Sequence, residues 1–266
     1  MASVETLRPL SFRTIFISDV HLGFRGCQAD LLLDFLRSTR CETLFLVGDI
    51  VDVWSMRKGL YWPQAHNDVV RTILGKAKHG TRVVYVPGNH DEVFRSHVGV
   101  VFGNVRIARR WIHETADGKR LLVLHGDEFD GVVQCSPLLA RVGSRAYEFL
   151  IWLNGYVNAL RRRMGYQYWS LAAFLKHKVK NAVQYIGAFE EAVASAARRQ
   201  GVDGLVCGHI HRPEIRDVNG VLYCNDGDWV ESCSALVEHR DGRLELLDWA
   251  AMRARETEAS ARERAA

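Results

Sequence analysis

Residues 14–21 of the chain read Thr-Ile-Phe-Ile-Ser-Asp-Val-His, and this segment predicts most strongly how the chain folds. The β-branched and aromatic residues of 14–18 favour a strand. Asp19 and His21 follow where that strand would end. A carboxylate and an imidazole spaced two residues apart can reach the same ion. The segment therefore predicts a buried strand that delivers two candidate metal ligands.

The same arrangement recurs along the chain. Further strands are expected at Thr43–Val47, Arg82–Val86, Arg120–Leu124 and Gly204–Cys207. Each runs into a polar cluster: Gly48-Asp49, Gly88-Asn89-His90-Asp91, His125-Gly126-Asp127 and Gly208-His209-Ile210-His211. Helical spacing at Ala29–Ser38, Gln64–Lys78 and Phe189–Arg199, and hairpins at Glu214–Tyr223 and Ser234–Leu247, complete a layered α/β pattern. Because sites assemble at the carboxyl ends of strands in such sheets, we expect the five clusters to converge on one rim.

Taken one at a time, these clusters have ordinary structural explanations. Asp49 could cap a helix, and His209 and His211 could be hydrogen-bonded core histidines. Asp127 could support a ligand histidine or cap a turn. Two further acids, Asp52 and Asp228, receive no catalytic role, although Asp52 is expected beside the ligands. The order and completeness of the five clusters argue against a purely structural explanation.

The ordered set D-x-H, G-D, G-N-H-D, H-G-D and G-H-x-H resembles the calcineurin-like metallophosphoesterase superfamily. The resemblance spans residues 14–248. It implies an α/β four-layer sandwich, in which helices flank two mixed β-sheets, with a helical insertion that acts as a lid. It divides the chain into a core at residues 1–127 and 188–252, a lid at 128–187 and a flexible C-terminal tail at 253–266.

The resemblance also assigns the metal ligands. One divalent ion would be held by Asp19, His21, Asp49 and His211, and a second by Asp49, Asn89, His125 and His209, with Asp49 bridging. These donors favour Mn, Fe or Zn over Mg or Ca, and manganese is the expected metal. In this superfamily a hydroxide bridging the two ions attacks phosphorus. His90 would stabilise the phosphoryl group or protonate the leaving oxygen, and Asp91 would orient His90.

Length and composition are those of a folded globular protein. The 266 residues are 48% hydrophobic and 25% charged, which excludes a disordered or collagen-like chain. The six cysteines form no C-x-x-C pair, so reduced thiols are expected. No apolar run reaches the roughly 18 residues of a membrane span, and residues 1–13 lack the apolar core of a secretory signal. A cytoplasmic protein is expected.

Residues 131–187 differ from the rest of the chain. They hold eight Lys or Arg residues against one acid, and nine aromatic side chains fall between Tyr147 and Tyr185. The candidate substrate-binding residues, which could meet a diphosphate or anionic lipid head groups, are Arg161, Arg162, Arg163, Lys176 and Lys180. The alternative is a helical hairpin whose aromatic residues pack on the core and whose basic residues are simply solvated. Because the excess of basic over acidic residues is confined to this segment and is not spread along an extended groove, nucleic acid is not expected as a partner.

Three features narrow the substrate. The S-D-V-H-L-G and G-D-I-V-D-V-W segments and the long insertion are similar to those of bacterial UDP-2,3-diacylglucosamine pyrophosphatases. The resemblance implies that an acylated sugar nucleotide of lipid A biosynthesis is hydrolysed to UMP, with the lid against the inner membrane. The best-known members of that branch carry Arg after the Asn of the third motif, where this chain has His90. The alternatives are a phosphodiesterase or phosphatase acting on nucleotides or other small phosphoesters, and a scaffold without turnover, which would lose ligands that are kept here.

Overall fold

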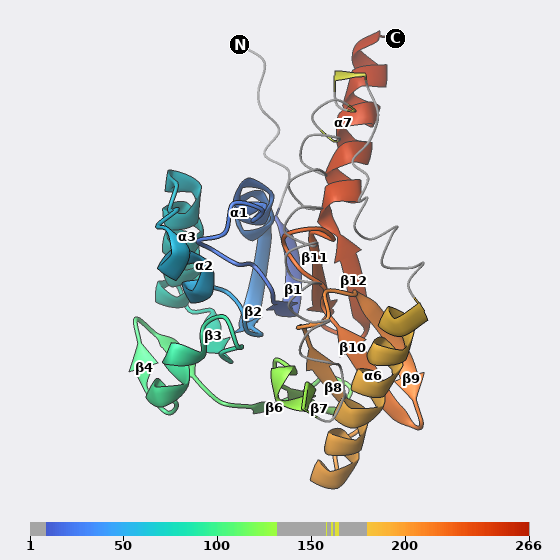
Figure 1. Cartoon of the computed structure of the whole chain (residues 1–266). Coiled ribbons are helices and arrows are strands. Elements are labelled where there is room, and N and C mark those ends of the chain that lie inside the picture. Colours follow the sequence, from blue (N-terminus) through green and yellow to red (C-terminus); the bar gives the residue numbers. More distant parts are fainter. Residues whose placement is uncertain (1–8, 132–157, 159–160, 162, 165–179, 266) are drawn as a thin grey trace.

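The computed structural model describes residues 9–131, 158, 161, 163–164 and 180–265. In this part of the chain two β-sheets lie face to face, and helices cover their outer faces (Figure 1). The carboxyl ends of the central strands meet at one rim of this sandwich, where the polar clusters lie.

The larger sheet has seven strands in the order β12-β11-β1-β2-β3-β5-β4. Its parallel strands are β1 (Leu10–Ile17), β2 (Thr39–Leu46), β3 (Arg82–Tyr85) and β5 (Val105–Ile107). The antiparallel additions are β4 (Val101–Phe102), β11 (Ser234–Glu238) and β12 (Leu244–Asp248). Strand β1 is buried along its last four residues, as a central strand covered on both faces must be.

The smaller sheet has five strands in the order β6-β7-β8-β10-β9. Strands β7 (Arg120–Val123), β8 (Gly204–Cys207) and β10 (Val221–Asn225) run parallel. Strands β6 (Trp111–Glu114) and β9 (Glu214–Val218) pair antiparallel at the two edges. This sheet is therefore mixed, like the larger one.

Three apolar clusters separate four layers. Helices α1 (Ala29–Ser38), α3 (Gln64–Lys78) and α7 (Trp249–Ala265) pack on the outer face of the larger sheet. Helix α6 (Lys180–Gln200) packs on the outer face of the smaller sheet. Side chains such as Phe16, Phe45 and Val206 fill the space between the two sheets. The predicted sandwich of two mixed sheets flanked by helices is confirmed.

The strand and helix predictions hold for most of the core. Helices 29–38 and 64–78 and strand 204–207 have the expected bounds. Strands β1 and β2 begin four residues earlier than expected, and helix α6 begins at Lys180 rather than Phe189. The short helices α2 (Val53–Lys58), η1 (Glu92–His97) and η2 (Asp127–Phe129) and the strands β4, β5 and β6 were not predicted.

The expected insertion lies largely outside the described residues, so the division into core, lid and tail stays a prediction. Helix α7 begins at Trp249, and the Arg253 side chain pairs with Asp34 of α1. The first residue of the expected tail is thus attached to the core.

The thiols agree with the expectation where they are described. Cys27, Cys41, Cys207, Cys224 and Cys233 are free, and Cys135 lies outside the described residues. Within the described segments, no helix combines the length and the apolar character needed to cross a bilayer.

Candidate metal centre

The loops that follow β1, β2, β3, β7 and β8 come together at one rim, and backbone hydrogen bonds join them. The Asp19 N–H donates to the Gly48 carbonyl at 3.0 Å, and the His21 N–H donates to the Asp49 carbonyl at 2.9 Å. The Gly208 N–H donates to the His125 carbonyl at 3.2 Å. Because each loop is held by the next, the side chains of the polar clusters face a common centre.

The backbone at the predicted ligands has an uncommon conformation. Eight non-glycine residues of the described chain have positive φ, and five of them are predicted metal ligands with φ between 48° and 69°: Asp19, His21, Asp49, His209 and His211. A left-handed backbone costs a non-glycine residue about 1–3 kcal/mol, and such residues gather at functional sites. The fold therefore holds these side chains in place against a local conformational cost.

Two glycines let the loops approach the ligands closely. A Cβ on Gly48 would lie 2.3 Å from His125 Nδ1, and a Cβ on Gly88 would lie 2.2 Å from Asp49 Oδ1. Neither contact is sterically allowed. The glycine of each motif is thus explained by the space that the neighbouring ligand occupies.

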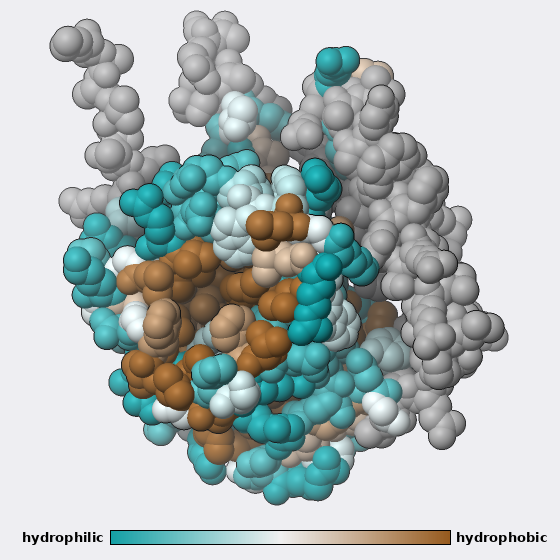
Figure 2. Space-filling model, turned by 60° about the vertical axis from the view of Figure 1, so that its left-hand side comes forward, coloured by the Kyte–Doolittle hydropathy of each residue, from teal (hydrophilic) through white to brown (hydrophobic). Residues whose placement is uncertain are grey.

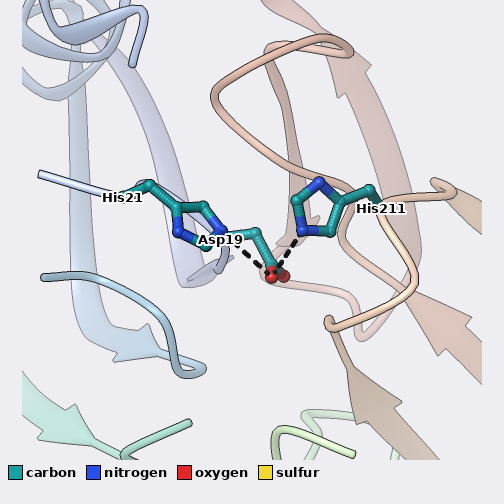
Figure 3. A group of neighbouring side chains, drawn as sticks. All are labelled: Asp19, His21 and His211. Carbon is teal, nitrogen blue, oxygen red and sulfur yellow. Dashed lines mark ion pairs between the residues drawn. The ribbon is translucent and has the colours of Figure 1, made fainter. Parts of the chain in front are cut away.

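Carboxylates and imidazoles lie at ligand spacing around this centre. Asp19 Oδ1 lies between His21 Nε2, at 3.8 Å, and His211 Nε2, at 3.0 Å (Figure 3). Asp49 Oδ2 lies 3.4 Å from His125 Nε2. Three overlapping groups have donor atoms within 4.8 Å of one another: Asp19 with His21 and His211, His21 with Asp49 and His90, and Asp19 with Asp49 and His125.

Several buried metal-ligand atoms at this centre make no hydrogen bond of good geometry: Asp19 Oδ1, His21 Nε2, Asn89 Oδ1, His90 Nδ1, His125 Nε2 and His211 Nδ1. Four of them, Asp19 Oδ1, His21 Nε2, His90 Nδ1 and His125 Nε2, lie 3.0–3.8 Å from a carboxylate or imidazole atom of the same cluster. A buried polar atom without a hydrogen bond costs about 1–3 kcal/mol, so several such atoms around one point indicate a place where a bound cation or water would stabilise the fold. Nitrogen and oxygen donors of this kind bind transition-metal ions. The residues present therefore fit the divalent metals that the sequence predicted.

The electrostatics agree with a cation site. Burial alone would lower the pKa of His21, but hydrogen bonds to Asp19 and Asp52 outweigh it and raise the pKa to about 10. Burial would likewise raise the pKa of Asp49, but the charge and hydrogen bond of His125 hold it below its usual range. The buried carboxylates are thus stabilised in their charged form by nearby positive charge, which protonated imidazoles or metal ions can supply.

His209 is placed differently from the other predicted ligands. Its Nε2 lies 2.8 Å from Asp130 Oδ1, and the Tyr185 hydroxyl donates to the same oxygen at 2.7 Å. The His209 ring lies 5.1 Å from the His125 ring, centroid to centroid. Burial would raise the pKa of Asp130, but the hydrogen bond and charge of His209 lower it. Asp130 was missed from the sequence, because an acid three residues beyond the H-G-D motif carries no distinctive signal.

His90 lies at the edge of the centre, and its carboxylate partner is Asp52. His90 Nδ1 lies 3.0 Å from Asp52 Oδ1, and Asp52 Oδ2 lies 3.3 Å from His21 Nδ1. The Trp54 ring packs on the His90 ring with 4.4 Å between centroids. Hydrogen bonds from His21 and His90 outweigh burial and lower the pKa of Asp52. The sequence expectation that Asp52 lies beside the ligands agrees with this geometry.

Asp91 holds the backbone rather than the His90 ring. Its carboxylate accepts hydrogen bonds from the N–H groups of Gly88 at 2.6 Å and Ile50 at 2.8 Å, and from the Tyr85 hydroxyl. The His90 imidazole, which Asp91 was expected to orient, is not among these partners. Burial, and then the charge of Asp49, raise the pKa of Asp91. Asp91 therefore joins the loop that follows β2 to the loop that follows β3.

The other acids have structural partners. Asp127 accepts two hydrogen bonds from Arg95, at 2.7 and 2.8 Å. Asp228 accepts from backbone N–H groups that follow it, such as that of Val230 at 2.8 Å, and so closes a turn. The Ser18 hydroxyl lies 2.6 Å from Asp19 Oδ2 and 2.7 Å from Asp226 Oδ1, and burial raises the pKa of Asp226 well above its usual value.

The candidate substrate-binding residues lie in or next to the least described part of the chain. Arg161 and Arg163 are described, Arg162 and Lys176 are outside the described residues, and Lys180 begins α6 without a described side chain. Their role stays a prediction.

The chain is similar to several known proteins. A family model described as calcineurin-like phosphoesterase matches residues 12–213. A UDP-2,3-diacylglucosamine hydrolase of Xanthomonas oryzae pv. oryzae is 28% identical over 251 residues, which cover 86% of this chain and 96% of that protein. The protein of that name from Azotobacter vinelandii is 26% identical over 211 residues, 77% of this chain and 84% of that protein. The structure of an archaeal phosphodiesterase superposes with a TM-score of 0.42 and 11% identity, and covers 88% of this chain and 98% of that chain.

The family match covers most of the chain and includes all five motifs, and the donor atoms of those motifs converge. The protein is therefore a metal-dependent phosphoester hydrolase that belongs to the calcineurin-like phosphoesterase family.

Proposed function

We propose that this hydrolase cleaves the diphosphate of an acylated sugar nucleotide of the UDP-2,3-diacylglucosamine type and releases UMP. The observation that carries hydrolysis is the set of buried metal-ligand atoms that converge at the strand ends. The substrate is supported by the relatives named UDP-2,3-diacylglucosamine hydrolase, whose lengths this chain covers by 84% to 96%.

Two divalent ions, expected to be manganese, would lower the pKa of bound water and offset the charge of the phosphoryl oxygens. Asp49 lies where one carboxylate can serve both ligand groups, next to His21 on one side and His125 on the other. The His90 side chain is 27% exposed, with Asp52 behind Nδ1. His90 Nε2 is thus the nitrogen left to face a phosphoryl oxygen, as a hydrogen-bond donor or as the acid for the leaving oxygen.

An exposed apolar surface supports the proposal that the substrate is amphipathic. The side of the molecule that carries α3 and β4 is turned forward in Figure 2 and bears a broad apolar area. Six large apolar side chains of residues 93–112 are exposed, and Phe102 reaches 74%: Val93, Val98, Val100, Val101, Phe102 and Ile112. Arg106, Arg109 and Trp111 line a depression of about 610 Å³ together with Val98. Apolar side chains next to arginines suit acyl chains and anionic head groups, and support contact with the inner membrane from the cytoplasmic side.

Incubation of the manganese-loaded protein with UDP-2,3-diacylglucosamine, followed by phosphorus NMR, tests this function. We expect UMP to appear, and we expect the Asp49→Asn variant to form at least about 10³-fold less because the shared ligand is weakened. Turnover of bis-p-nitrophenyl phosphate without UMP release would contradict the lipid substrate but not the hydrolase. Inertness toward both would favour a scaffold.

A second function is favoured by one residue. His90 stands where the pyrophosphatase branch carries Arg, so the phosphoryl group would meet an imidazole that can donate a proton. This suits hydrolysis of nucleotides or other small phosphoesters, whose leaving oxygens need protonation. Equal rates with short-chain and unacylated substrates would support this alternative.

A further inference from the structure

The contact between His209 and Asp130 has no role in the chemistry described above. His209 Nε2 lies 2.8 Å from Asp130 Oδ1. The His209 backbone N–H donates to Asp19 Oδ2 at 2.8 Å, which places the base of the side chain at the ligand cluster. Because an imidazole has two nitrogens and Nε2 is engaged, Nδ1 is the nitrogen left for a metal ion.

Two side chains of helix α6 contact this pair, one at Asp130 and one at His209. The Tyr185 hydroxyl donates to Asp130 Oδ1 at 2.7 Å, and the Phe189 ring lies 5.9 Å from the His209 ring, centroid to centroid. Tyr185 and Phe189 are four residues apart, so they lie on the same face of the helix. The same face of α6 thus contacts both the Asp130 carboxylate and the His209 ring.

We propose that Asp130 is a positioning residue for the second metal ion: it accepts the Nε2 proton of His209, orients Nδ1 toward the ion, and is itself held by Tyr185. The inference rests on the metal-dependent chemistry of the site and is independent of the substrate. Ligand histidines that donate their other N–H to a carboxylate bind metal more tightly, because the ring orientation and tautomer are fixed beforehand.

The exposure of Asp130 argues against a purely structural role. Its side chain is 49% exposed, whereas that of His209 is 13% exposed. A half-exposed ion pair contributes little to the free energy of unfolding, about 0–1 kcal/mol. The orientation of a ligand is a role that this geometry can perform without contributing much to stability.

Titration of the metal-free protein with Mn²⁺, followed by calorimetry, tests the proposal without measuring turnover. We expect two sites in the wild type. In Asp130→Ala the affinity of one site should fall about 10–100-fold while the other is unchanged. Asp130→Asn, which keeps an acceptor, and Tyr185→Phe should show smaller losses in the same site. Glu191→Gln is the matched control, because Glu191 lies on α6 and pairs with Arg198 and Asn219 away from the site.

Nitrogen-15 NMR of the Zn²⁺-loaded protein gives a readout that a merely structural acid would not change. We expect a protected Nε2–H resonance of His209 in the wild type, and its loss in Asp130→Ala with the fold intact by circular dichroism. Unchanged affinity at both sites in Asp130→Ala would overturn the proposal. So would tighter binding, which would mean that Asp130 competes with the ion. A wild type that binds no metal would instead refute the metal centre itself.

Discussion

At the scale of single residues, the site combines unfavourable backbone conformations with unpartnered donors. Five predicted ligands have a left-handed backbone, and atoms such as Asn89 Oδ1 and His211 Nδ1 are buried without a hydrogen bond. Neither feature stabilises the fold, since each costs free energy in the metal-free protein. Both are explained if a cation at the centre supplies the missing interactions.

Asp52 should matter for catalysis through His90. We expect Asp52→Asn to lower kcat for bis-p-nitrophenyl phosphate about 10–100-fold with little change in KM, because the amide cannot stabilise a charged His90. Ser55→Ala is the control, because it removes the hydroxyl that donates to Asp52 Oδ2 but keeps the cap hydrogen bond from the Ser55 N–H to Asp52 Oδ1 and the contact of Asp52 with His90. An unchanged kcat in Asp52→Asn, or an equal loss in Ser55→Ala, would contradict a role of Asp52 through His90.

Gly88 should be required for metal binding. In Gly88→Ala the new Cβ would lie 2.2 Å from Asp49 Oδ1 and 2.7 Å from His125 Cδ2, so the shared ligand must move. We expect the Mn²⁺ affinity to fall at least about tenfold. Gly75→Ala in α3 is the control, because no atom beyond the neighbouring backbone of its own helix lies within 4 Å of its Cβ position; that change should leave metal binding intact and stabilise the helix by about 0.5–1 kcal/mol. Wild-type affinity in Gly88→Ala would contradict the close approach.

The sequence predicted which side chains meet at the rim better than it predicted their hydrogen-bond partners. The order of the motifs predicted that Asp19, His21 and His211 would lie together, and they do, because parallel strands end at one rim. The hydrogen bonds of Asp91 and the contact of Asp130 with His209 could not be predicted, since they depend on how loops from separate strands cross.

At the scale of elements, long periodic segments were predictable and short ones were not. Helices α1 and α3 have clear apolar faces and match the expected bounds. Strands β4 and β5 have two and three residues, which is too short for an alternating pattern to be recognised. They form by pairing, β5 with β3 and β4 with β5, rather than from a pattern in their own sequence.

A buried acid joins the two sheets and should control acid stability. Glu238 of β11 lies 2.7 Å from His113 of β6 and accepts from the Ala116 N–H at 2.8 Å. Burial would raise the pKa of Glu238, but the hydrogen bonds from His113 and Thr14 lower it from 4.5 to about 2. The folded pKa is below the unfolded value, so this stabilisation is complete above about pH 4.5 and is lost as the pH falls toward 2.

Glu238→Gln should therefore lower the free energy of unfolding by about 2 kcal/mol at pH 7, and by much less near pH 3. Urea unfolding at both pH values measures the difference. Glu245→Gln on the neighbouring strand β12 is the control, because its side chain is 40% exposed and should change stability by less than about 1 kcal/mol. The same loss for Glu238→Gln at both pH values would contradict the linkage.

At the scale of the whole molecule, the metal centre lies where both sheets end, so occupancy should stabilise the entire core. A ligand that binds only the folded state, present at a concentration of about 1,000 times its Kd, adds about 4 kcal/mol to the free energy of unfolding. We expect Mn²⁺ to raise Tm and EDTA to reverse the rise, as measured by calorimetry. In Asp49→Asn the rise should be much smaller, and an equal rise there would place the ion elsewhere.

Anomalous diffraction from crystals grown with Mn²⁺ tests the central claim most directly. We predict two peaks about 3.5–4 Å apart, one beside Asp19, His21 and His211 and one beside Asn89 and His125, with Asp49 between them. A single peak, or peaks away from these side chains, would contradict the two-ion centre on which the proposed hydrolysis depends.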